Sequence, residues 1–178
     1  MNYENYTFQE AVKELADRAG VALPEMEYSA EYKKEADKKM VLLEINKEAA
    51  KYFYYQLRQE QGKLGYRYLS GRQLSDDTIK KFGLGFANKT SNDLTLYLKR
   101  KGYKDEQIIQ AGLATADERF GVHDKFWNRV IFPIMDINHR AIGFGGRVMG
   151  DGTPKYLNSP ETPVFDKSRN LYGLNFAR

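Results

Sequence analysis

The sequence predicts an α+β fold, in which a helical N-terminal part is followed by a small antiparallel sheet with a glycine-rich hairpin. Up to about residue 112, apolar residues recur mostly at three- and four-residue spacing, which is the period of an amphipathic helix. After Gly121 the pattern changes to short apolar runs separated by polar turns, which is typical of strands. Helices first and an antiparallel hairpin later indicate the α+β class.

The first predicted helix covers residues 8–19. Thr7 and Glu10 have the spacing of a capping box, and Gly20 supplies the stop. Little else in residues 1–30 could cover its apolar face, because residues 21–28 form a proline-containing connector. We therefore expect this helix to dock on the main body or on another domain.

The second predicted helix starts in a mixed-charge stretch, residues 31–39, which we interpret as a solvated helical face rather than a binding arm. It continues through apolar residues at helical spacing until Gly62. These residues are Met40, Leu43, Ala50, Phe53, Tyr54 and Leu57. We expect this stripe to pack in the core, and we do not interpret its tyrosines as a platform for stacking bases.

From Lys63 the predicted elements become short. In chain order they are a helical turn (66–70), a helix (76–82), a strand (84–86) and two helices (94–100 and 105–111). Ser75 is suited to cap the helix that follows it, and glycines end the others.

The predicted hairpin joins strands over residues 130–134 and 141–144 through a polar turn. Pro133 has no N–H to donate, so we expect its position to lie at a sheet edge or a bulge.

Composition excludes several classes of function. The 178 residues contain no cysteine and two histidines, which excludes disulfides and argues against a multi-histidine metal site. No apolar run approaches the roughly 18 residues of a membrane span, and no signal-peptide pattern opens the chain. The absence of cysteine fits a reducing, cytoplasmic environment. The net charge of +4 alone barely favours a nucleic-acid partner.

The distribution of charge is more informative than the total. From Gly121 onward, eight Lys and Arg residues stand against five acids, among turn residues and aromatics. An ordered anion-binding face is therefore a reasonable hypothesis for this part of the chain.

Two segments could carry chemistry. Residues 143–147, Gly-Phe-Gly-Gly-Arg, could bring backbone amides and a guanidinium close to a phosphate, although a glycine-filled strand bulge is favoured on spacing alone. Residues 154–162 form a proline-bounded loop that displays Lys155. A plain surface loop has the same residue classes, so composition leaves both readings open.

The same segments carry a family resemblance. Residues 142–147, 153–162 and 171–174 closely resemble the bacterial replicative primases of the DnaG type, and the lysine-bearing loop is the most specific of them. Matching stretches also occur at residues 68–74, 82–87 and 128–133, and residues 3–20 resemble the segment that joins the family's zinc domain to its polymerase region.

The resemblance implies a division of the chain and a set of binding residues. Residues 1–30 would be a connector helix and linker from a preceding zinc-binding domain, and residues 31–178 the N-terminal subdomain of the catalytic core. That subdomain would provide a basic groove for single-stranded DNA template, RNA primer and nucleoside triphosphates. The implied nucleic-acid- or nucleotide-binding residues are Arg72, Arg129, Arg147, Lys155, Asn158 and Lys167. For Trp127 we favour core packing over base stacking.

The resemblance also implies what lies elsewhere. Catalytic Mg²⁺ or Mn²⁺ would be held by a TOPRIM subdomain, Zn²⁺ by the zinc domain, and the replicative helicase would bind a C-terminal region, all outside these residues. The acids present form no Asp-x-Asp pair. Since two-metal phosphoryl transfer requires such ligands, we expect no catalytic residue, no metal site and no primer synthesis from this chain alone.

Two other functions are alternatives to this interpretation. The first is a primase-derived protein-interaction or scaffolding module whose basic face docks an acidic partner. The second, an unrelated hydrolase, is disfavoured by the absence of cysteine, the scarcity of histidine and the lack of a Gly-x-Ser-x-Gly elbow.

Overall fold

The computed structural model describes residues 8–21, 30–119 and 121–176. The chain divides into two compact units, Met1–Lys38 and Lys39–Arg178, and each is described by itself. The boundary between these units falls inside a long helix. The division into a connector (residues 1–30) and a subdomain (31–178) remains a prediction. No helix among the described residues is long and apolar enough to cross a membrane.

The first unit contains α1 (Phe8–Ala19) and the start of α2 (Ala30–Leu57). The predicted first helix is confirmed, and Gly20 follows it with φ of 65°, as expected of a glycine stop. Ala16 is buried, whereas Leu15 is 65% exposed. Thr7 of the expected capping box and the connector over residues 22–29 lie outside the described residues.

The long helix α2 enters the second unit and ends at Leu57, five residues before the predicted stop at Gly62. Its last turns tighten, because Arg58 and Gln59 donate to carbonyls only three residues back. The chain then folds against the helix end as a 3₁₀ turn, η1 (Glu60–Gly62). A side chain at Gly62 would meet the carbonyl oxygen of Gln56 at 2.2 Å, so this close return requires a glycine.

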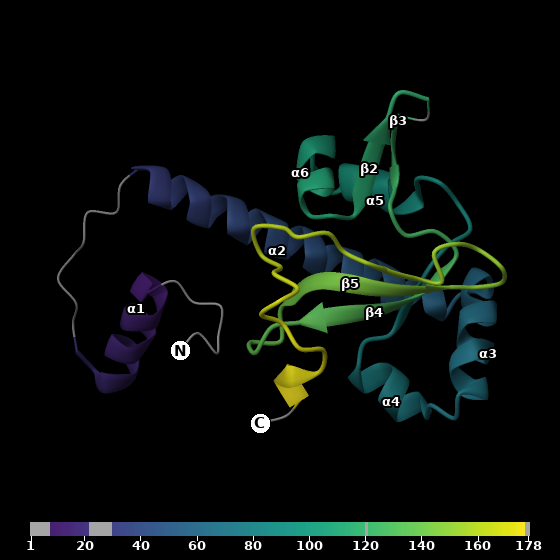
Figure 1. Ribbon diagram of the computed structural model, residues 1–178, viewed down its shortest axis with the longest axis horizontal. Coiled ribbons are helices and arrows are strands. Elements are labelled where there is room, and N and C mark those ends of the chain that lie inside the picture. Colours follow the sequence, from purple (N-terminus) through teal and green to yellow (C-terminus); the bar gives the residue numbers. More distant parts are fainter. Residues whose placement is uncertain (1–7, 22–29, 120, 177–178) are drawn as a thin grey trace. The chain divides into compact units, whose positions relative to one another are not determined.

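The main sheet of the second unit has four antiparallel strands in the order β1-β4-β5-β6. They are β1 (Gly85–Ala87), β4 (Arg129–Met135), β5 (Ala141–Val148) and β6 (Tyr156–Asn158). The α+β class and the central hairpin β4–β5 were predicted (Figure 1). The strand β6 was not, because its residues had been assigned to the lysine-bearing loop.

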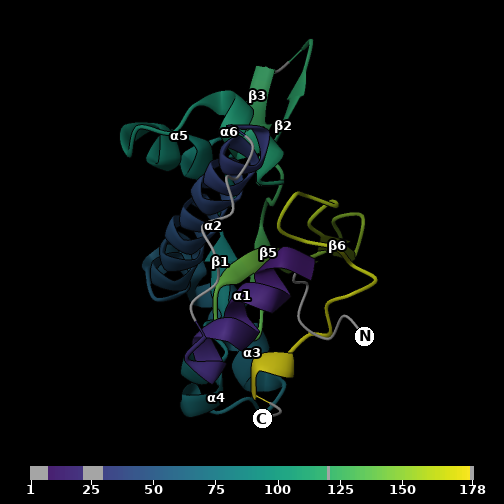
Figure 2. The same ribbon diagram turned by 90° about the vertical axis from the view of Figure 1, so that its left-hand side faces the viewer.

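The remaining elements are short. They are α3 (Lys63–Gly71), α4 (Asp76–Lys81), α5 (Asp93–Arg100), α6 (Asp105–Gln110), the hairpin β2 (Ala114–Asp117) and β3 (Gly121–Asp124), and η2 (Leu174–Phe176). The predicted cap of α4 is confirmed, since Ser75 Oγ accepts from Thr78 N at 3.2 Å. Figures 1 and 2 both show α5, α6 and the β2–β3 hairpin at one end of the second unit, with α4 at the opposite end.

Both faces of the main sheet pack against helices, and α2 contributes a residue to each. On one face, Phe144 of β5 meets Phe53 of α2 with ring centroids 5.4 Å apart, within the larger core cluster. On the other face, Val130 packs with Leu57 and with Leu69 of α3. Alternation along the strands therefore decides which helices each side chain of β4 and β5 meets. Met40, expected in the stripe of α2 that packs in the core, is instead exposed.

The expectation for Pro133 is confirmed. Pairing between β1 and β4 ends at Ile131, two residues before Pro133. On the other side, the β4–β5 register shifts between Ile134 and Met135. The proline therefore sits beyond the end of one neighbouring strand and beside a bulge, where a missing N–H breaks little of the ladder.

Candidate nucleic-acid interface

Two of the predicted binding residues meet at one tyrosine ring. The guanidinium carbon of Arg147 lies 4.9 Å from the ring centroid of Tyr68, and that of Arg72 lies 5.5 Å from the same centroid. Arg147 comes from β5, whereas Arg72 follows the last residue of α3. The fold therefore brings together two cations that are 75 positions apart in the sequence, and the ring holds both by cation–π attraction.

The Arg147 guanidinium is only partly satisfied. Its Nη1 donates to the carbonyl of Val148, while its buried Nε has no hydrogen-bond partner among the described residues. The buried Nε is not available to a ligand, but the half-buried guanidinium has further N–H groups besides the one that bonds to Val148. Such a group is suited to a phosphate oxygen, because charge-assisted hydrogen bonds to phosphate are strong and directional.

The lysine-bearing loop lies directly beside Arg147. Strand β6 pairs with β5 so that Tyr156 is opposite Arg147 and Asn158 is opposite Gly145. Paired residues share a face of the sheet, so Tyr156 and Asn158 are on the Arg147 side. The Lys155 ammonium lies 5.9 Å from the Tyr156 ring, which is 63% exposed. The register thus gathers a lysine, an arginine, an asparagine and an aromatic ring at one edge of the sheet.

Gly145, the first of the adjacent glycines in the Gly-Phe-Gly-Gly-Arg element, makes room for Asn158. A Cβ at Gly145 would lie 3.1 Å from the side-chain oxygen of Asn158. The asparagine therefore rests over a bare stretch of backbone on the neighbouring strand. Gly145 continues the regular ladder, and the register shift of this hairpin lies at residues 134–135 instead. The favoured reading of this element as a glycine-filled bulge is wrong.

Ser159, which follows this group, supports the loop from inside. It is fully buried, its N–H donates to the Phe144 carbonyl at 2.8 Å, and its Oγ accepts from the Phe144 N–H at 2.9 Å. The serine side chain thus takes the place of a carbonyl in the sheet ladder.

Arg129 differs from the other predicted cations because it is only 4% exposed. By strand alternation it points to the face on which Phe144 packs, opposite to that of Arg147. Its Nη1 donates to the carbonyls of Gly146 and Lys155 at 3.3 and 3.5 Å. Burial lowers the pKa of this guanidinium. In this position the side chain contacts the sheet and the loop and not solvent, so Arg129 does not belong to the exposed cations of the candidate interface.

Lys167 is exposed in the segment after β6, where its backbone N–H donates to a carboxylate oxygen of Glu161 at 3.1 Å. The structure therefore keeps Lys167 at the surface, and its own contacts are with this turn.

Trp127 is not a core residue, contrary to the interpretation favoured from sequence. It is 41% exposed, and the Lys89 ammonium lies 5.9 Å from its ring. Both residues are in loops that are joined by the Asn128 N–H, which donates to the Asn88 carbonyl at 3.0 Å. Sequence analysis missed Lys89, since an isolated lysine in a polar loop carries no signal of its own. An exposed aromatic ring beside a cation is a common arrangement for single-stranded nucleic acid.

The described residues hold no group of three or more His, Asp or Glu side chains that could bind a metal ion.

Comparison with known proteins identifies relatives in sequence and in fold. The family model for the DNA primase catalytic core, N-terminal domain, matches residues 52–178. A DNA primase of Clostridium acetobutylicum is 43% identical over 179 residues, which cover 99% of this chain and 29% of that protein. The chain thus spans less than a third of the length of this curated relative.

Two solved structures are similar in fold as well. The DnaG primase catalytic domain bound to single-stranded DNA has a TM-score of 0.73 and 39% identity, over 80% of this chain and 44% of the other. The RNA polymerase domain of Mycobacterium tuberculosis primase DnaG, in complex with double-stranded DNA, has a TM-score of 0.74 and 33% identity, over 78% and 44%.

The fold and these matches place the chain among domains of the primase class. More narrowly, the chain belongs to the DNA primase catalytic core, N-terminal domain family. The resemblance to DnaG-type primases found in the sequence is thereby confirmed.

Proposed function

We propose that this chain is part of a replicative DNA primase that makes short RNA primers on single-stranded DNA, and that its second unit supplies a basic surface for template and primer. The observation that carries the proposal is the meeting of Arg72 and Arg147 at the Tyr68 ring. Lys155 and Asn158 extend this surface along β6. The relative solved with single-stranded DNA supports a nucleic-acid partner for this surface.

The proposed role of the surface is electrostatic. Cations neutralise phosphates of the template, the primer or an incoming triphosphate, and their binding free energy includes the release of counterions. Side chains fixed by neighbouring rings and strands lose less conformational freedom on binding than free lysines would. Lys167 remains part of the proposal as an exposed cation further along the chain.

The chemistry itself is assigned to other parts of the full-length protein. We expect this chain alone to be inactive, since two-metal phosphoryl transfer needs a carboxylate cluster. Mg²⁺ or Mn²⁺ in a TOPRIM subdomain, Zn²⁺ in a zinc-binding domain and a helicase contact would belong to the remainder of a bacterial cytoplasmic enzyme. The Aquifex aeolicus primase structure with zinc-binding and RNA polymerase domains covers 97% of this chain, which supports a connecting role for its first residues.

The test is titration of the 178-residue chain with labelled single-stranded DNA at several salt concentrations. We expect micromolar or weaker affinity. With four or five contacted phosphates, log affinity should fall with log salt with a slope of about −3, from roughly −0.7 per contact. A flat salt response would contradict the proposal, and binding to an acidic protein but not to DNA would favour the interaction-module alternative.

A matched pair of variants locates the surface. Arg147→Ala and Arg140→Ala remove the same charge from the same hairpin, but Arg140 is paired with Asp136 at 2.7 Å in the β4–β5 turn. Only Arg147→Ala should weaken DNA binding strongly and reduce the salt slope. Equal effects of the two substitutions would show that net charge, and not this surface, determines binding.

A further inference from the structure

Arg129 is buried, and a side chain that only filled space at this position would not need a charge. Among the described residues no carboxylate lies within ion-pair distance of its guanidinium. Its two hydrogen bonds go to backbone carbonyls of Gly146 and Lys155. Burial of an arginine without an acidic partner is unfavourable. The two hydrogen bonds to carbonyls are therefore the interactions that compensate for the burial of this charge.

The side chain reaches these carbonyls because Gly146 is bare. A Cβ at Gly146 would lie 2.9 Å from Cδ of Arg129 and 2.9 Å from the ring of Phe126. Because Gly146, the second of the two adjacent glycines, has no side chain, the aliphatic part of Arg129 can pack directly over the backbone of β5. Neither glycine has a positive φ, so the space above them, not their backbone conformation, explains why they are glycines.

Arg129, Val148 and Lys155 form one row across the sheet. Arg129 of β4 pairs with Val148 of β5, and the Val148 N–H donates to the Lys155 carbonyl at 3.1 Å. The Arg129 guanidinium donates to the same carbonyl from the buried face of the sheet. Lys155 is thus fixed through its backbone, while its ammonium remains exposed beside the Tyr156 ring.

We propose that Arg129 is a positioning residue for the lysine-bearing loop: it holds the Lys155 backbone from inside the sheet and does not contact nucleic acid. This inference rests on the proposed function, because it takes Lys155 as a contact to the polyanion. It assigns to Arg129 a role different from that of Arg72 and Arg147. Both hydrogen bonds come from Nη1, so one end of the planar guanidinium reaches the Gly146 carbonyl on β5 and the Lys155 carbonyl just before β6. A lysine has no planar fork that would hold its donors in this orientation.

The principal test substitutes Arg129→Met in the 178-residue chain, with Arg140→Met as the exposed control on the same hairpin. Methionine keeps an unbranched apolar stem over Gly146 and removes the charge, so the melting temperature should change little. Amide hydrogen exchange should rise at Val148 and across residues 155–158, and not in the helices. Affinity for single-stranded DNA should fall about fivefold, the effect of one hydrogen bond of typical net strength.

A double-substitution cycle with Lys155→Ala separates positioning from general stability. If Arg129 acts through Lys155, then Lys155→Ala should weaken binding less in the Arg129→Met background than in the native one. Arg72→Ala should weaken binding equally in both backgrounds. A purely structural Arg129 would instead lower the melting temperature and raise exchange throughout the sheet, and that result would overturn the inference.

The remaining outcomes distinguish this inference from the proposed function. If Lys155→Ala leaves DNA affinity unchanged in the native background, Lys155 does not contact the DNA and does not belong to the proposed surface. Unchanged exchange at Val148 and residues 155–158 in Arg129→Met would overturn the positioning role whatever the affinity. Should Arg129→Met fail to fold, Arg129→Lys retains the charge, and its loop exchange should lie above that of the native protein.

Discussion

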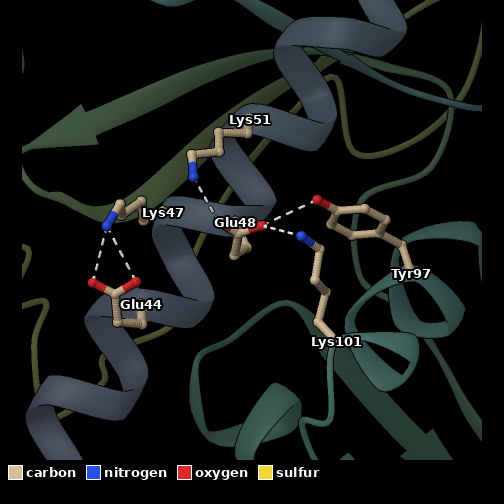
Figure 3. Close-up of polar contacts among 6 residues, drawn as sticks. All are labelled: Glu44, Lys47, Glu48, Lys51, Tyr97 and Lys101. Carbon is tan, nitrogen blue, oxygen red and sulfur yellow. Dashed lines mark hydrogen bonds and ion pairs between the residues drawn. The ribbon is translucent and has the colours of Figure 1, made fainter.

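The Lys101 ammonium lies 3.2 Å from a carboxylate oxygen of Glu48, and this contact joins the C-terminal end of α5 to the middle of α2 (Figure 3). The Tyr97 hydroxyl donates to the same oxygen at 3.1 Å, and Lys51 donates to the other oxygen at 2.7 Å. The hydrogen bond from Lys51 is the largest cause that lowers the pKa of Glu48, from 4.5 to about 2, with Lys101 and Tyr97 adding to it. One carboxylate thus connects three donors from two helices.

We predict that Glu48→Gln lowers the free energy of unfolding at neutral pH by about 1 kcal/mol, a value kept small because both lysines are exposed. The pKa of Glu48 is lower in the folded chain, so its contribution is complete above pH 4.5 and disappears as the pH falls towards 2. Urea unfolding of both proteins across this range measures the difference. The control Glu44→Gln removes a pair with Lys47 on the same exposed helix face and should have little effect.

Asp124 provides a second, more buried connection. Its carboxylate accepts from the N–H groups of Leu94 and Thr95 at 2.9 and 2.8 Å and from the Thr95 hydroxyl at 2.6 Å. A side chain from β3 therefore caps the start of α5, about thirty residues away in the sequence.

We predict that Asp124→Asn destabilises the second unit by about 2 kcal/mol, because an amide group would replace one acceptor oxygen and face donors with its own N–H. Thermal or urea unfolding measures this loss. The control is Asp151→Asn, which removes the same charge from an exposed position between β5 and β6. Equal stability of the two variants would show that α5 does not depend on this cap.

These contacts show why the sequence predicted some features and not others. The cap at Ser75 and the stop at Gly20 depend on residues one turn away, so a local pattern contains all the information. Strand β6 forms only because residues 156–158 find an open edge at β5, and nothing in a loop rich in proline and polar residues indicates that partner.

Burial of individual side chains was the other feature that the sequence could not give. Arginine is rarely fully buried and tryptophan commonly is largely buried, so Arg129 was expected at the surface and Trp127 in the core. The structure reverses both. The adjacent glycines were the available signal for Arg129, since a strand without side chains at these positions leaves room for the aliphatic part of an arginine. Only the strand register shows which arginine occupies that room.

Trp127 offers a direct optical test of the interface, because it is the only tryptophan in the chain. If its exposed ring stacks on a base, saturating single-stranded DNA should quench its fluorescence and protect it from iodide. Lys89→Ala, which removes the neighbouring cation, should weaken binding and reduce the salt slope by about 0.7. Labelled DNA establishes saturation independently. Unchanged tryptophan emission at saturation would place the bound strand away from this ring.

Lys155 gives the most specific prediction for the full-length protein. We expect Lys155→Ala to impair primer synthesis much more than folding, because the ammonium is exposed and only the Lys155 backbone takes part in the sheet. In an assembled polymerase cleft, the loss of one preorganised cation can reduce the rate on the order of 100-fold. Primer synthesis measures the effect, and thermal melting serves as the folding control.

Lys155→Arg then distinguishes the position of the charge from its presence. Arginine keeps the charge but replaces a compact ammonium with a planar fork, which requires a different approach to phosphate oxygens. If the ammonium must occupy a defined place beside Tyr156, Lys155→Arg should restore little activity; if only the local field matters, it should restore most of it. Near-normal synthesis by Lys155→Ala would remove this residue from the interface. A fall in melting temperature that matched the lost activity would instead make Lys155 a structural residue of the loop.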